Sequence, residues 1–560
     1  MKRRTFLTGL SGALVGRPFL SGIGRADHAP GAVTSNTSGM NVLLINVEDL
    51  TTNAVGCYGN SIVKTPHLDR FADSAVRFAR CYCQAPMCNP SRSSFLTGLR
   101  PGTTKIYRNS DAMHRLLPEG TRSLPELLHQ YGLHTVNIGK LFHHTWTAEQ
   151  QLGAFDQLEF CGLPKGYQGV TRGLPPDIRA KVTAAPEPRF RYSPDADVEN
   201  RMNELKARRD DVWRRVERGS AEYNAARARF QQPMANIIGD SGLTDEREHD
   251  GQKARLAAHL LHQLAKEKDP FFMSLGFSKP HTPLRCPQKY LDLYDVEDIP
   301  SPSAPAEQDR NIPDVAKRFG RNYDIFNSTF EGPVTDEAVR QAIAAYYACV
   351  SFIDAQIGIV LAALDDAGLR NDTIVIILSD HGFHLGEHGL WSKYTLFEQS
   401  TRVPLLVRVP GVTTGATCDE IVELVDLLPT LCELLVIPPP DNPEGTSFVP
   451  LLSDPRQPWK LAAFTVCALA NHIGRSVRTK RWRYADWQSE KTSMRQFELY
   501  DLDNDPWEQN NLALDPGHRN QRTILANLLQ RGWSVAHQRG AAESANQAGL
   551  PAHRCRHILW

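Results

Sequence analysis

"NVLLINVEDL", residues 41–50, is the clearest indication of fold class in this 560-residue chain. Its apolar run has no helical period and ends in two acids, Glu48 and Asp49, which is typical of a strand buried in a sheet. Such strands belong to largely parallel sheets covered by helices, and ligands bind beyond their carboxyl ends. The two acids are therefore candidate functional residues.

Four other segments have the same character, and two helical patterns lie between them. The strands are "HTVNIGK" (134–140), "FFMSLGF" (271–277), "TIVIILSDHG" (373–382) and "VPLLVRVP" (403–410); the helices are "TRSLPELLHQYG" and "ACVSFIDAQIGIVLAALDDAG". This alternation predicts an α/β domain with a largely parallel sheet. Lys140 ends one strand and the pair Asp380-His381 ends another, so we expect these residues to meet the two acids at one sheet edge.

The composition is that of an ordinary folded protein with 41% hydrophobic and 22% charged residues. The formal net charge is zero, which argues against a nucleic-acid partner held by bulk electrostatics. A local basic pocket would have to bind any anionic substrate. Beyond the N-terminal leader, we predict no segment long and apolar enough to span a membrane.

The N-terminus, "MKRRTFLTGLSGALVG", has the twin arginines Arg3 and Arg4 before a short apolar run that Arg17 interrupts. Together with the small residues Gly24 and Ala26, this pattern predicts a Tat-type signal peptide over residues 1–26. We expect a bacterial protein exported to the periplasm or the medium. A Sec-type signal or an uncleaved anchor is the alternative.

The remaining chain is predicted to contain a catalytic domain over 40–440 and a smaller C-terminal subdomain over 455–535. The proline-rich "VIPPPDNPEG" lies at their boundary. Three short strand patterns in the second unit, "AAFTVCAL", "RSVRTKRWRYADW" and "FELYDL", indicate an α+β fold with an antiparallel sheet. Residues 199–232 favour a solvated, charged helix, and 536–560 a loose tail.

"CYCQAPMCNPSRSSFLTG", residues 81–98, places three cysteines within eight positions. A disulfide from Cys88 to Cys57, Cys81 or Cys83 is one interpretation, a metal site is another, and chemical conversion of Cys88 is a third. The chain has 11 cysteines, and an odd number in an exported protein leaves one free or special.

The run from Cys88 to Arg92, "CNPSR", followed by "LTG", resembles the signature of type I sulfatases. Five segments in order are similar to the iduronate-2-sulfatase branch of that family, in the alkaline phosphatase superfamily: "GCYGN", "CNPSRSSFLTGLRPGTTKIY", "GKLFHH", "SKPHTPLRCP" and "SDHGFHLGEHGLWSKYTLFEQSTRVPLLVRVPG". The resemblance covers most of residues 41–510. It implies an alkaline-phosphatase-like fold and conversion of Cys88 to formylglycine by a formylglycine-generating enzyme.

That modification suits the chemistry of a sulfate ester. The attack needs an oxygen nucleophile, a cation at the charged oxygens and an acid for the leaving oxygen. A formylglycine hydrate has one hydroxyl to attack sulfur and a second through which sulfate can be expelled, which serine and cysteine lack.

By resemblance, the metal set for one Ca²⁺ is Glu48, Asp49, Asp380, His381 and the residue formed from Cys88. The chain departs from the family at Glu48, where the usual residue is aspartate and the extra methylene changes the reach. His381 is an unusual ligand for a hard cation and can instead lie at the edge of the site. Taken alone, acids at strand ends are more often caps or salt-bridge partners.

The implied catalytic set is Cys88, Arg92, Lys140, His143, His281 and Lys393. Lys140 would hold the oxygens of formylglycine and sulfate, and His143 would take the proton that releases sulfate. His144 is a competing assignment for His143.

His281 and Lys393 would grip sulfate, one of them protonating the leaving oxygen, and Arg92 would orient the nucleophile. His384 and His388 have the i, i+4 spacing of a zinc site, but nearby glycines favour a loop beside the substrate pocket.

The resemblance therefore implies a sulfuric ester hydrolase acting on a sulfated carbohydrate, such as a 2-O-sulfated uronic acid of a glycosaminoglycan-like polymer. A phosphodiesterase or phosphonate monoester hydrolase with the same modified cysteine is one alternative. A non-catalytic protein that binds sulfated glycans is the other, and Glu48 is its only support in the sequence.

Overall fold

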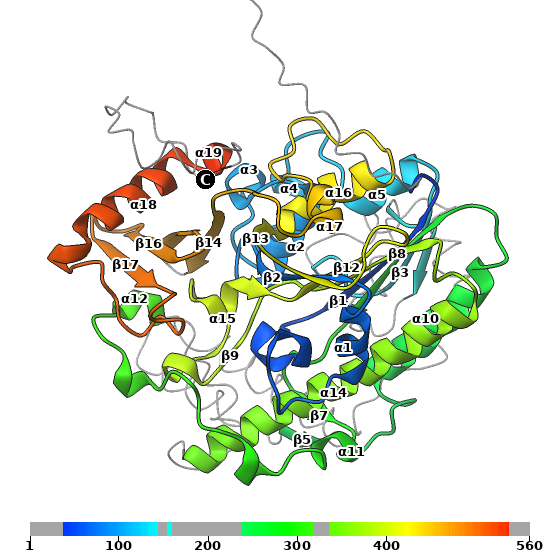
Figure 1. Ribbon diagram of the computed structural model, residues 1–560, viewed down its shortest axis with the longest axis horizontal. Coiled ribbons are helices and arrows are strands. Elements are labelled where there is room, and N and C mark those ends of the chain that lie inside the picture. Colours follow the sequence, from blue (N-terminus) through cyan, green and yellow to red (C-terminus); the bar gives the residue numbers. More distant parts are fainter. Residues whose placement is uncertain (1–36, 144–153, 160–237, 318–334, 470, 537–560) are drawn as a thin grey trace, which may run out of the picture.

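The computed structural model describes residues 37–143, 154–159, 238–317, 335–469 and 471–536. The predicted signal peptide, the charged segment 199–232 and nearly all of the predicted tail lie outside these ranges. The described chain forms a central sheet between helices and a smaller C-terminal sheet beside it (Figure 1).

The strand predicted from "NVLLINV" is β1 (Asn41–Val47), at the middle of the central sheet. It pairs in parallel with β6 (Phe271–Phe277) on one side and β8 (Thr373–Ser379) on the other. Beyond β6 follow β3 (His134–Gly139) and β4 (Gln157–Glu159), also parallel. All residues of β1 are buried, and they alternate between two cores, which confirms a strand covered on both faces.

The other half of the sheet is mixed. β12 (Leu405–Arg408) runs antiparallel to both β8 and β2 (Val76–Tyr82). The two-residue β11 (Arg402–Val403) is antiparallel to β2, whereas β13 (Ala416–Glu423) is parallel to it. The run predicted as one strand over 403–410 is thus two short strands, and the largely parallel sheet is confirmed with this reversal.

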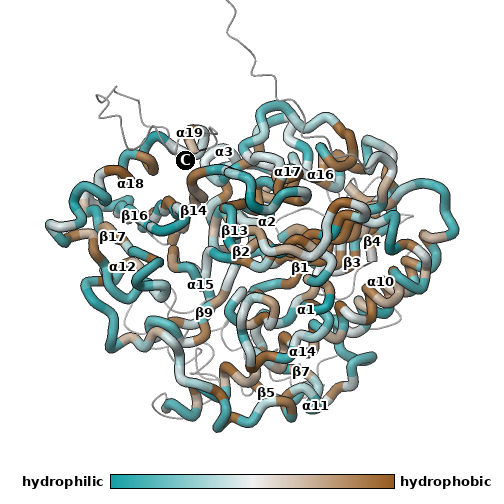
Figure 2. Tube along the Cα trace, viewed as in Figure 1, coloured by the Kyte–Doolittle hydropathy of each residue, from teal (hydrophilic) through white to brown (hydrophobic). Residues whose placement is uncertain are grey.

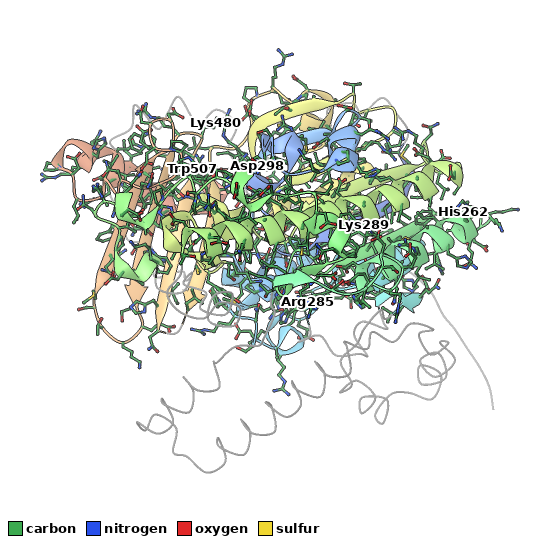
Figure 3. The ribbon with its side chains drawn as sticks, turned by 90° about the horizontal axis from the view of Figure 1, so that it is seen from below. His262, Arg285, Lys289, Asp298, Lys480 and Trp507 are labelled. Atoms are coloured by element: carbon green, nitrogen blue, oxygen red, sulfur yellow. The ribbon has the colours of Figure 1, made fainter. Side chains whose placement is uncertain are left out.

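Helices cover both faces of the sheet (Figure 1). One face carries α1 (Pro66–Ala72), α10 (His249–Leu264) and α14 (Asp336–Asp366); the other carries α2 (Cys88–Thr97), α5 (Leu124–Gln130), α16 (Leu427–Leu434) and α17 (Val449–Ser453). Figure 2 shows the most apolar segments gathered where the sheet lies between these layers. Viewed from below, α10 and α14 run across one face, and His262 marks the exposed side of α10 (Figure 3).

Helix α14 bears on the expectation of no membrane span. By length and composition it is apolar enough to cross a membrane, with a mean hydropathy of 1.8 in its best window. However, 78% of that window is buried inside the protein, against α10 and the sheet. Its apolar surface therefore forms core, as for the central helix of a globular domain.

The C-terminal sheet is antiparallel, as predicted, but it has four strands because the segment "RSVRTKRWRYADW" contributes to two of them. The four strands are β14 (Ala463–Leu469), β15 (His472–Arg478), β16 (Trp482–Ser489) and β17 (Arg495–Asp501), covered by α18 (Arg519–Arg531) and α19 (Trp533–Ala536). The amide of Val466 donates to the Gln84 carbonyl at 2.9 Å, which joins this sheet to the segment before Cys88.

Short elements complete the described chain. They are α3 (Pro101–Thr104), α4 (Met113–Leu116), β5 (Ile238–Asp240), β7 (Leu284–Cys286), α11 (Gln288–Leu291), α12 (Asp314–Lys317), β9 (His384–Leu385), β10 (Trp391–Ser392) and α15 (Glu398–Thr401). The proline-rich segment 436–445 joins α16 to α17, which share one core.

Candidate active site

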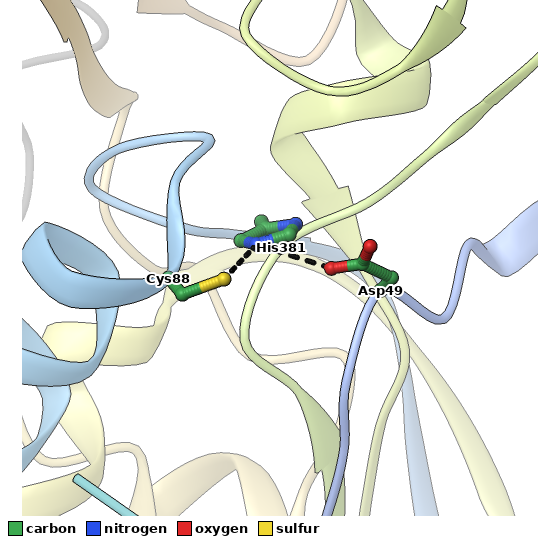
Figure 4. Close-up of side chains that lie close together, drawn as sticks. All are labelled: Asp49, Cys88 and His381. Carbon is green, nitrogen blue, oxygen red and sulfur yellow. Dashed lines mark hydrogen bonds and ion pairs between the residues drawn. The ribbon is translucent and has the colours of Figure 1, made fainter. Parts of the chain in front are cut away.

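The carboxyl ends of the central strands bring the predicted polar residues together at one sheet edge. Candidate ligand atoms lie within 4.8 Å of one another in three overlapping groups: Asp49, Cys88 and His381; Glu48, Cys88 and Asp380; and Glu48, Asp49 and His281. The acids follow β1 and β8, and Cys88 is the first residue of α2. Figure 4 shows His381 between Cys88 and Asp49.

Cys88 lies at the centre of this cluster and is 2% exposed. Its Sγ is 3.3 Å from His381 Nε2, 3.4 Å from Glu48 Oε1 and 3.4 Å from Lys393 Nζ. Burial raises the pKa of the thiol to about 12, so the unmodified side chain is a neutral thiol at pH 7. The positive end of the α2 macrodipole also points here, which favours a bound anion.

Each of the three acids has a cationic partner. Glu48 pairs with Lys140, Asp49 Oδ1 lies 2.6 Å from Lys393 Nζ, and Asp380 Oδ2 lies 2.9 Å from Arg92 Nε. Burial opposes ionisation, but the surrounding cations, with Lys140 the strongest of them, together outweigh it and hold the pKa of Glu48 well below its usual value. Arg92 lowers the pKa of Asp380 in the same way. Cations therefore hold Glu48 and Asp380 in the ionised form in a buried space.

Arg92 connects two strand ends as well as balancing charge. Besides its contact with Asp380 after β8, its Nη1 donates to the carbonyls of Lys140 and Leu141, both at 2.9 Å, after β3. The guanidinium is 1% exposed, so these hydrogen bonds are shielded from water. Arg92 thus fixes the position of Lys140 relative to the acids.

The backbone at Asp49 has φ 61°, a conformation that non-glycine residues rarely adopt. Two hydrogen bonds hold it: Asp49 N donates to Asp380 Oδ1 at 3.2 Å, and Tyr346 Oη donates to the Asp49 carbonyl at 2.6 Å. Strained residues of this kind cluster at functional sites. Sequence reasoning missed Tyr346, because on the apolar α14 it carries no signal beyond that of a core residue.

His381 is oriented by its own backbone neighbour. Its Nδ1 donates to the Gly382 carbonyl at 3.0 Å, which leaves Nε2 facing Cys88 and Asp49. Burial lowers the pKa of His381, so the ring is neutral with a lone pair on Nε2. This is the form in which histidine binds a metal.

His281 and Lys140 lie at the exposed side of the cluster, with side chains 39% and 30% exposed. His281 Nε2 is 3.9 Å from Asp49 Oδ2, and Nδ1 donates to the Thr282 carbonyl at 2.8 Å. His143 is buried two residues after Leu141. The competing His144 lies outside the described residues. The roles of all these residues stay predictions.

His384 and His388 do not form a metal site with each other. His384 Nε2 lies 2.8 Å from Thr395 Oγ1, whereas His388 Nδ1 lies 2.8 Å from Asp309 Oδ1 and its ring stacks on Phe397. His388 has φ 58°, so no regular helix continues through the segment, as the glycines predicted. These are structural histidines of a loop core.

The donors around Cys88 fit a divalent cation. Three carboxylates and a neutral imidazole Nε2 converge in a buried space, and hard cations such as Ca²⁺ prefer carboxylate oxygens. Cys57, Cys81, Cys83 and Cys88 are all free thiols, so no disulfide occupies residue 88. The structure therefore does not support a disulfide between Cys88 and any of these cysteines.

The site belongs to a chain whose residues 40–437 match the family model described as "Sulfatase", well over half of its length. The chain belongs to the sulfatase family. Residues 386–533 also match the model described as "N-sulphoglucosamine sulphohydrolase, C-terminal", which includes the antiparallel sheet. The sulfatase is thus a sulfuric ester hydrolase, of a family that generally uses formylglycine and a metal ion.

Known relatives resemble the sulfatase over most of its length. A sulfatase of Formosa agariphila is 31% identical over 498 residues, covering 88% of this chain and 86% of that protein. Iduronate 2-sulfatase of Mus musculus is 30% identical over 452 residues, covering 74% and 72%. The crystal structure of phosphonate monoester hydrolase of Agrobacterium radiobacter matches with a TM-score of 0.65 at 22% identity, covering 88% and 95%; the predicted alkaline-phosphatase-like fold is confirmed.

Proposed function

We propose that the sulfatase removes sulfate from a sulfated carbohydrate, with the nucleophile formed at position 88 by conversion of Cys88 to formylglycine. The observation that carries the proposal is the place of Cys88: its Sγ lies within 3.4 Å of a carboxylate, an imidazole and an ammonium, at the positive end of α2. A nucleophile for a sulfate ester needs these groups around it, because the substrate is anionic and the attacking oxygen must be oriented.

The proposed cofactors are one Ca²⁺ and formylglycine. Glu48, Asp49 and Asp380 would hold the metal with residue 88, and His381 Nε2 faces the same space. When bound, the metal compensates the charge of the sulfate oxygens, and the formylglycine hydrate supplies the attacking hydroxyl. The pKa values of Glu48 and Asp380 are both lowered, so these two carboxylates need no deprotonation to bind a cation.

The cations of the cluster have distinct positions for the reaction. Lys393 Nζ is buried and 3.4 Å from Cys88 Sγ, where it would hold a sulfate oxygen beside the nucleophile. Lys140 lies on the exposed side, and Arg92 keeps it there through its backbone carbonyl. Together they provide the local basic pocket that an anionic ester requires in a chain without net charge.

The proposed acid for the leaving oxygen is His281. Its Nδ1–H donates to the Thr282 carbonyl, so the proton given to the leaving oxygen would come from Nε2 of the doubly protonated ring, which faces the cluster. The side chain is 39% exposed, and the sugar must leave towards solvent. His143, which is buried and follows Lys140 by three residues, is the proposed base for the step that releases sulfate.

The proposed substrate is a 2-O-sulfated uronic acid within a glycosaminoglycan-like polymer. Its support is the similarity to iduronate 2-sulfatase of Mus musculus over 74% of this chain. The fold itself selects no sugar, because one fold carries many specificities.

The test compares rates on aryl sulfate and aryl phosphate esters, and then on disaccharides sulfated at O2 of the uronic acid or at O6 of the hexosamine. We expect faster turnover of the sulfate ester and of the O2-sulfated sugar, and no turnover by Cys88→Ala. Preference for the phosphate ester would favour the phosphodiesterase or phosphonate hydrolase alternative. Preference for the O6-sulfated sugar would contradict the proposed 2-O-sulfated substrate but not the sulfatase activity.

Export through a Tat-type signal is a separate proposal, based on Arg3 and Arg4. Folding in a reducing cytosol would allow Cys88 to be modified before it meets an oxidising compartment. Replacing both arginines by lysine should retain the protein in the cytosol. Normal export of that variant would contradict the Tat assignment.

A further inference from the structure

A buried ion pair on α10 has no part in the proposed chemistry. The buried positions of this helix other than Gly251 form a stripe at helical spacing: Asp250, Lys253, Ala254, Ala257, Leu260, Leu261 and Leu264. Its first two members are charged, yet Asp250 and Lys253 are only 2% and 1% exposed. Burying an ion pair costs desolvation energy that apolar side chains of similar volume would not. The pair therefore needs a reason other than stability.

The Lys253 ammonium makes three directed hydrogen bonds that an apolar residue cannot replace. Nζ donates to Asp250 Oδ1 at 2.9 Å, to the Gly276 carbonyl at 2.8 Å and to Ser278 Oγ at 2.9 Å. A lysine ammonium has three protons, so all of its donors are used. Two of these bonds reach the carboxyl end of β6.

Asp250 holds the backbone that follows β6. Its carboxylate accepts from the amides of Ser278 at 3.0 Å and Lys279 at 2.8 Å. His281, the proposed acid, comes two residues later, and its amide donates to the Ser278 carbonyl at 2.9 Å. The ion pair thus fixes the start of the loop that carries His281.

The same lysine touches the end of β3, which carries Lys140. A Cβ built on Gly139 would lie 2.9 Å from Lys253 Cε, so the lysine stem fills the space beside that glycine. Gly139 and Gly276 are paired in register, and a Cβ on Gly276 would overlap the Lys140 backbone. One ion pair therefore contacts both strand ends from which Lys140 and His281 extend.

We infer that Asp250 and Lys253 are positioning residues that set the distance between Lys140 and His281 across the β3–β6 boundary. The inference rests on the proposed function for the roles of Lys140 and His281. Displacement of a reacting group by about 1 Å can cost about 100-fold in rate, so such a pair would act on turnover without touching substrate.

The test is a double-mutant cycle on turnover of an aryl sulfate. Lys253→Met should lower kcat about 10- to 100-fold with little change in KM, because the group is displaced and not lost. In the His281→Asn background the same substitution should lower kcat less than about 3-fold, since coupled residues are non-additive. An equal factor in both backgrounds would overturn the inference. If Lys253→Met fails to fold, Ser278→Ala removes one acceptor and should show the same non-additivity with a smaller effect.

The matched control is Lys460→Met. Lys460 is equally buried, and its Nζ lies 2.8 Å from both Glu423 Oε2 and Asp426 Oδ1, away from the two strand ends. We expect this variant to lose stability but to keep the wild-type kcat of its folded fraction. If Lys460→Met loses as much turnover as Lys253→Met, the effect is a general one of removing a buried lysine. That result would overturn the positioning role of Lys253.

Hydrogen exchange separates failure of this inference from failure of the proposed function. Amides of the segment 276–283 should exchange faster in Lys253→Met than in Lys460→Met, because Asp250 loses the cation that fixes it. Equal exchange would overturn positioning whatever the kinetics show. Wild-type kcat in both His281→Asn and Lys140→Met would instead contradict the proposed function.

Discussion

Glu48 and Asp380 beside Cys88 are ionised although they are buried, because cations pair with them. Glu48 pairs with Lys140, and Asp380 accepts from Arg92 at 2.9 Å. The side chain of Glu48 contacts both Lys140 and Cys88. The negative charges of these carboxylates are already balanced by Lys140 and Arg92. We therefore expect binding of a divalent cation to depend on every carboxylate of the site.

Calcium binding is the first prediction. Ca²⁺ at 100 times its Kd should raise the free energy of unfolding by about 2.7 kcal/mol, and EDTA should remove the gain. Asp380→Asn should abolish the effect in thermal denaturation, because it removes a buried carboxylate of the candidate set. As a control, Asp515→Asn changes an acid that is 44% exposed and should leave the effect intact. A calcium response retained in Asp380→Asn would contradict this ligand set.

The residues of the site come together because they follow the ends of neighbouring strands. β1 delivers Glu48 and Asp49, β8 delivers Asp380 and His381, and β3 delivers Lys140. Close backbone packing between β3 and β6 keeps these ends in register. At Gly276, even a methyl group would overlap the Lys140 backbone.

Gly276→Ala is therefore predicted to lower both stability and activity. The methyl group must push the end of β3 away, and overpacking of this kind costs about 1–3 kcal/mol. Gly517→Ala is the control, because its Cβ would meet no atom closer than 3.4 Å and its change should stay within about 0.5 kcal/mol. Thermal denaturation and aryl sulfate turnover measure the two effects. Unchanged turnover by Gly276→Ala would show that Lys140 tolerates displacement.

Sequence reasoning predicts the elements whose burial is uniform. The runs 41–47, 271–277 and 373–379 are strands because continuous apolar residues suit a sheet covered on both faces. The reversed direction of 405–408 was not predictable, since it depends on which partner strand lies beside it. The proposed positioning role of Lys253 was missed for a related reason. It depends on the groups that the ammonium contacts, and the helix sequence does not show them.

The C-terminal sheet is held to the central sheet by a buried network of charges. Glu398 Oε1 accepts from Arg478 Nε at 2.6 Å and from Arg483 Nη2 at 2.5 Å. Arg483 also pairs with Glu508 at 2.5 Å. Glu398 begins α15, and the Thr401 carbonyl at its end accepts from the Cys83 amide at 2.9 Å. The network thus continues from the C-terminal strands to the segment that precedes Cys88.

Glu398 should make stability dependent on pH. Burial alone would raise its pKa, but Arg478 and Arg483 outweigh burial and lower the pKa from 4.5 to about 2. The folded state thus binds fewer protons than the unfolded state between about pH 4.5 and 2, so this stability is present above pH 4.5 and lost as pH falls through that window. Glu398→Gln should weaken the dependence of stability on pH in this window, and it should lower the free energy of unfolding by about 3–5 kcal/mol at neutral pH.

Denaturant unfolding across pH measures both effects, with Asp365→Asn as the control. Asp365 is 42% exposed and pairs with Arg370 on the surface, so its loss should cost less than about 1 kcal/mol. If the free energy of unfolding falls equally steeply with decreasing pH in Glu398→Gln and in wild type, the pH dependence belongs to other groups.

The most direct measurement is mass spectrometry of the tryptic peptide that contains Cys88, from protein made in its native host. Replacing the thiol-bearing group by an aldehyde predicts a loss of about 18 Da relative to the cysteine peptide, as required for the proposed nucleophile. That loss, together with turnover of an aryl sulfate, is the predicted result. An unmodified thiol in a sample that hydrolyses sulfate esters would contradict formylglycine at position 88 as the source of activity.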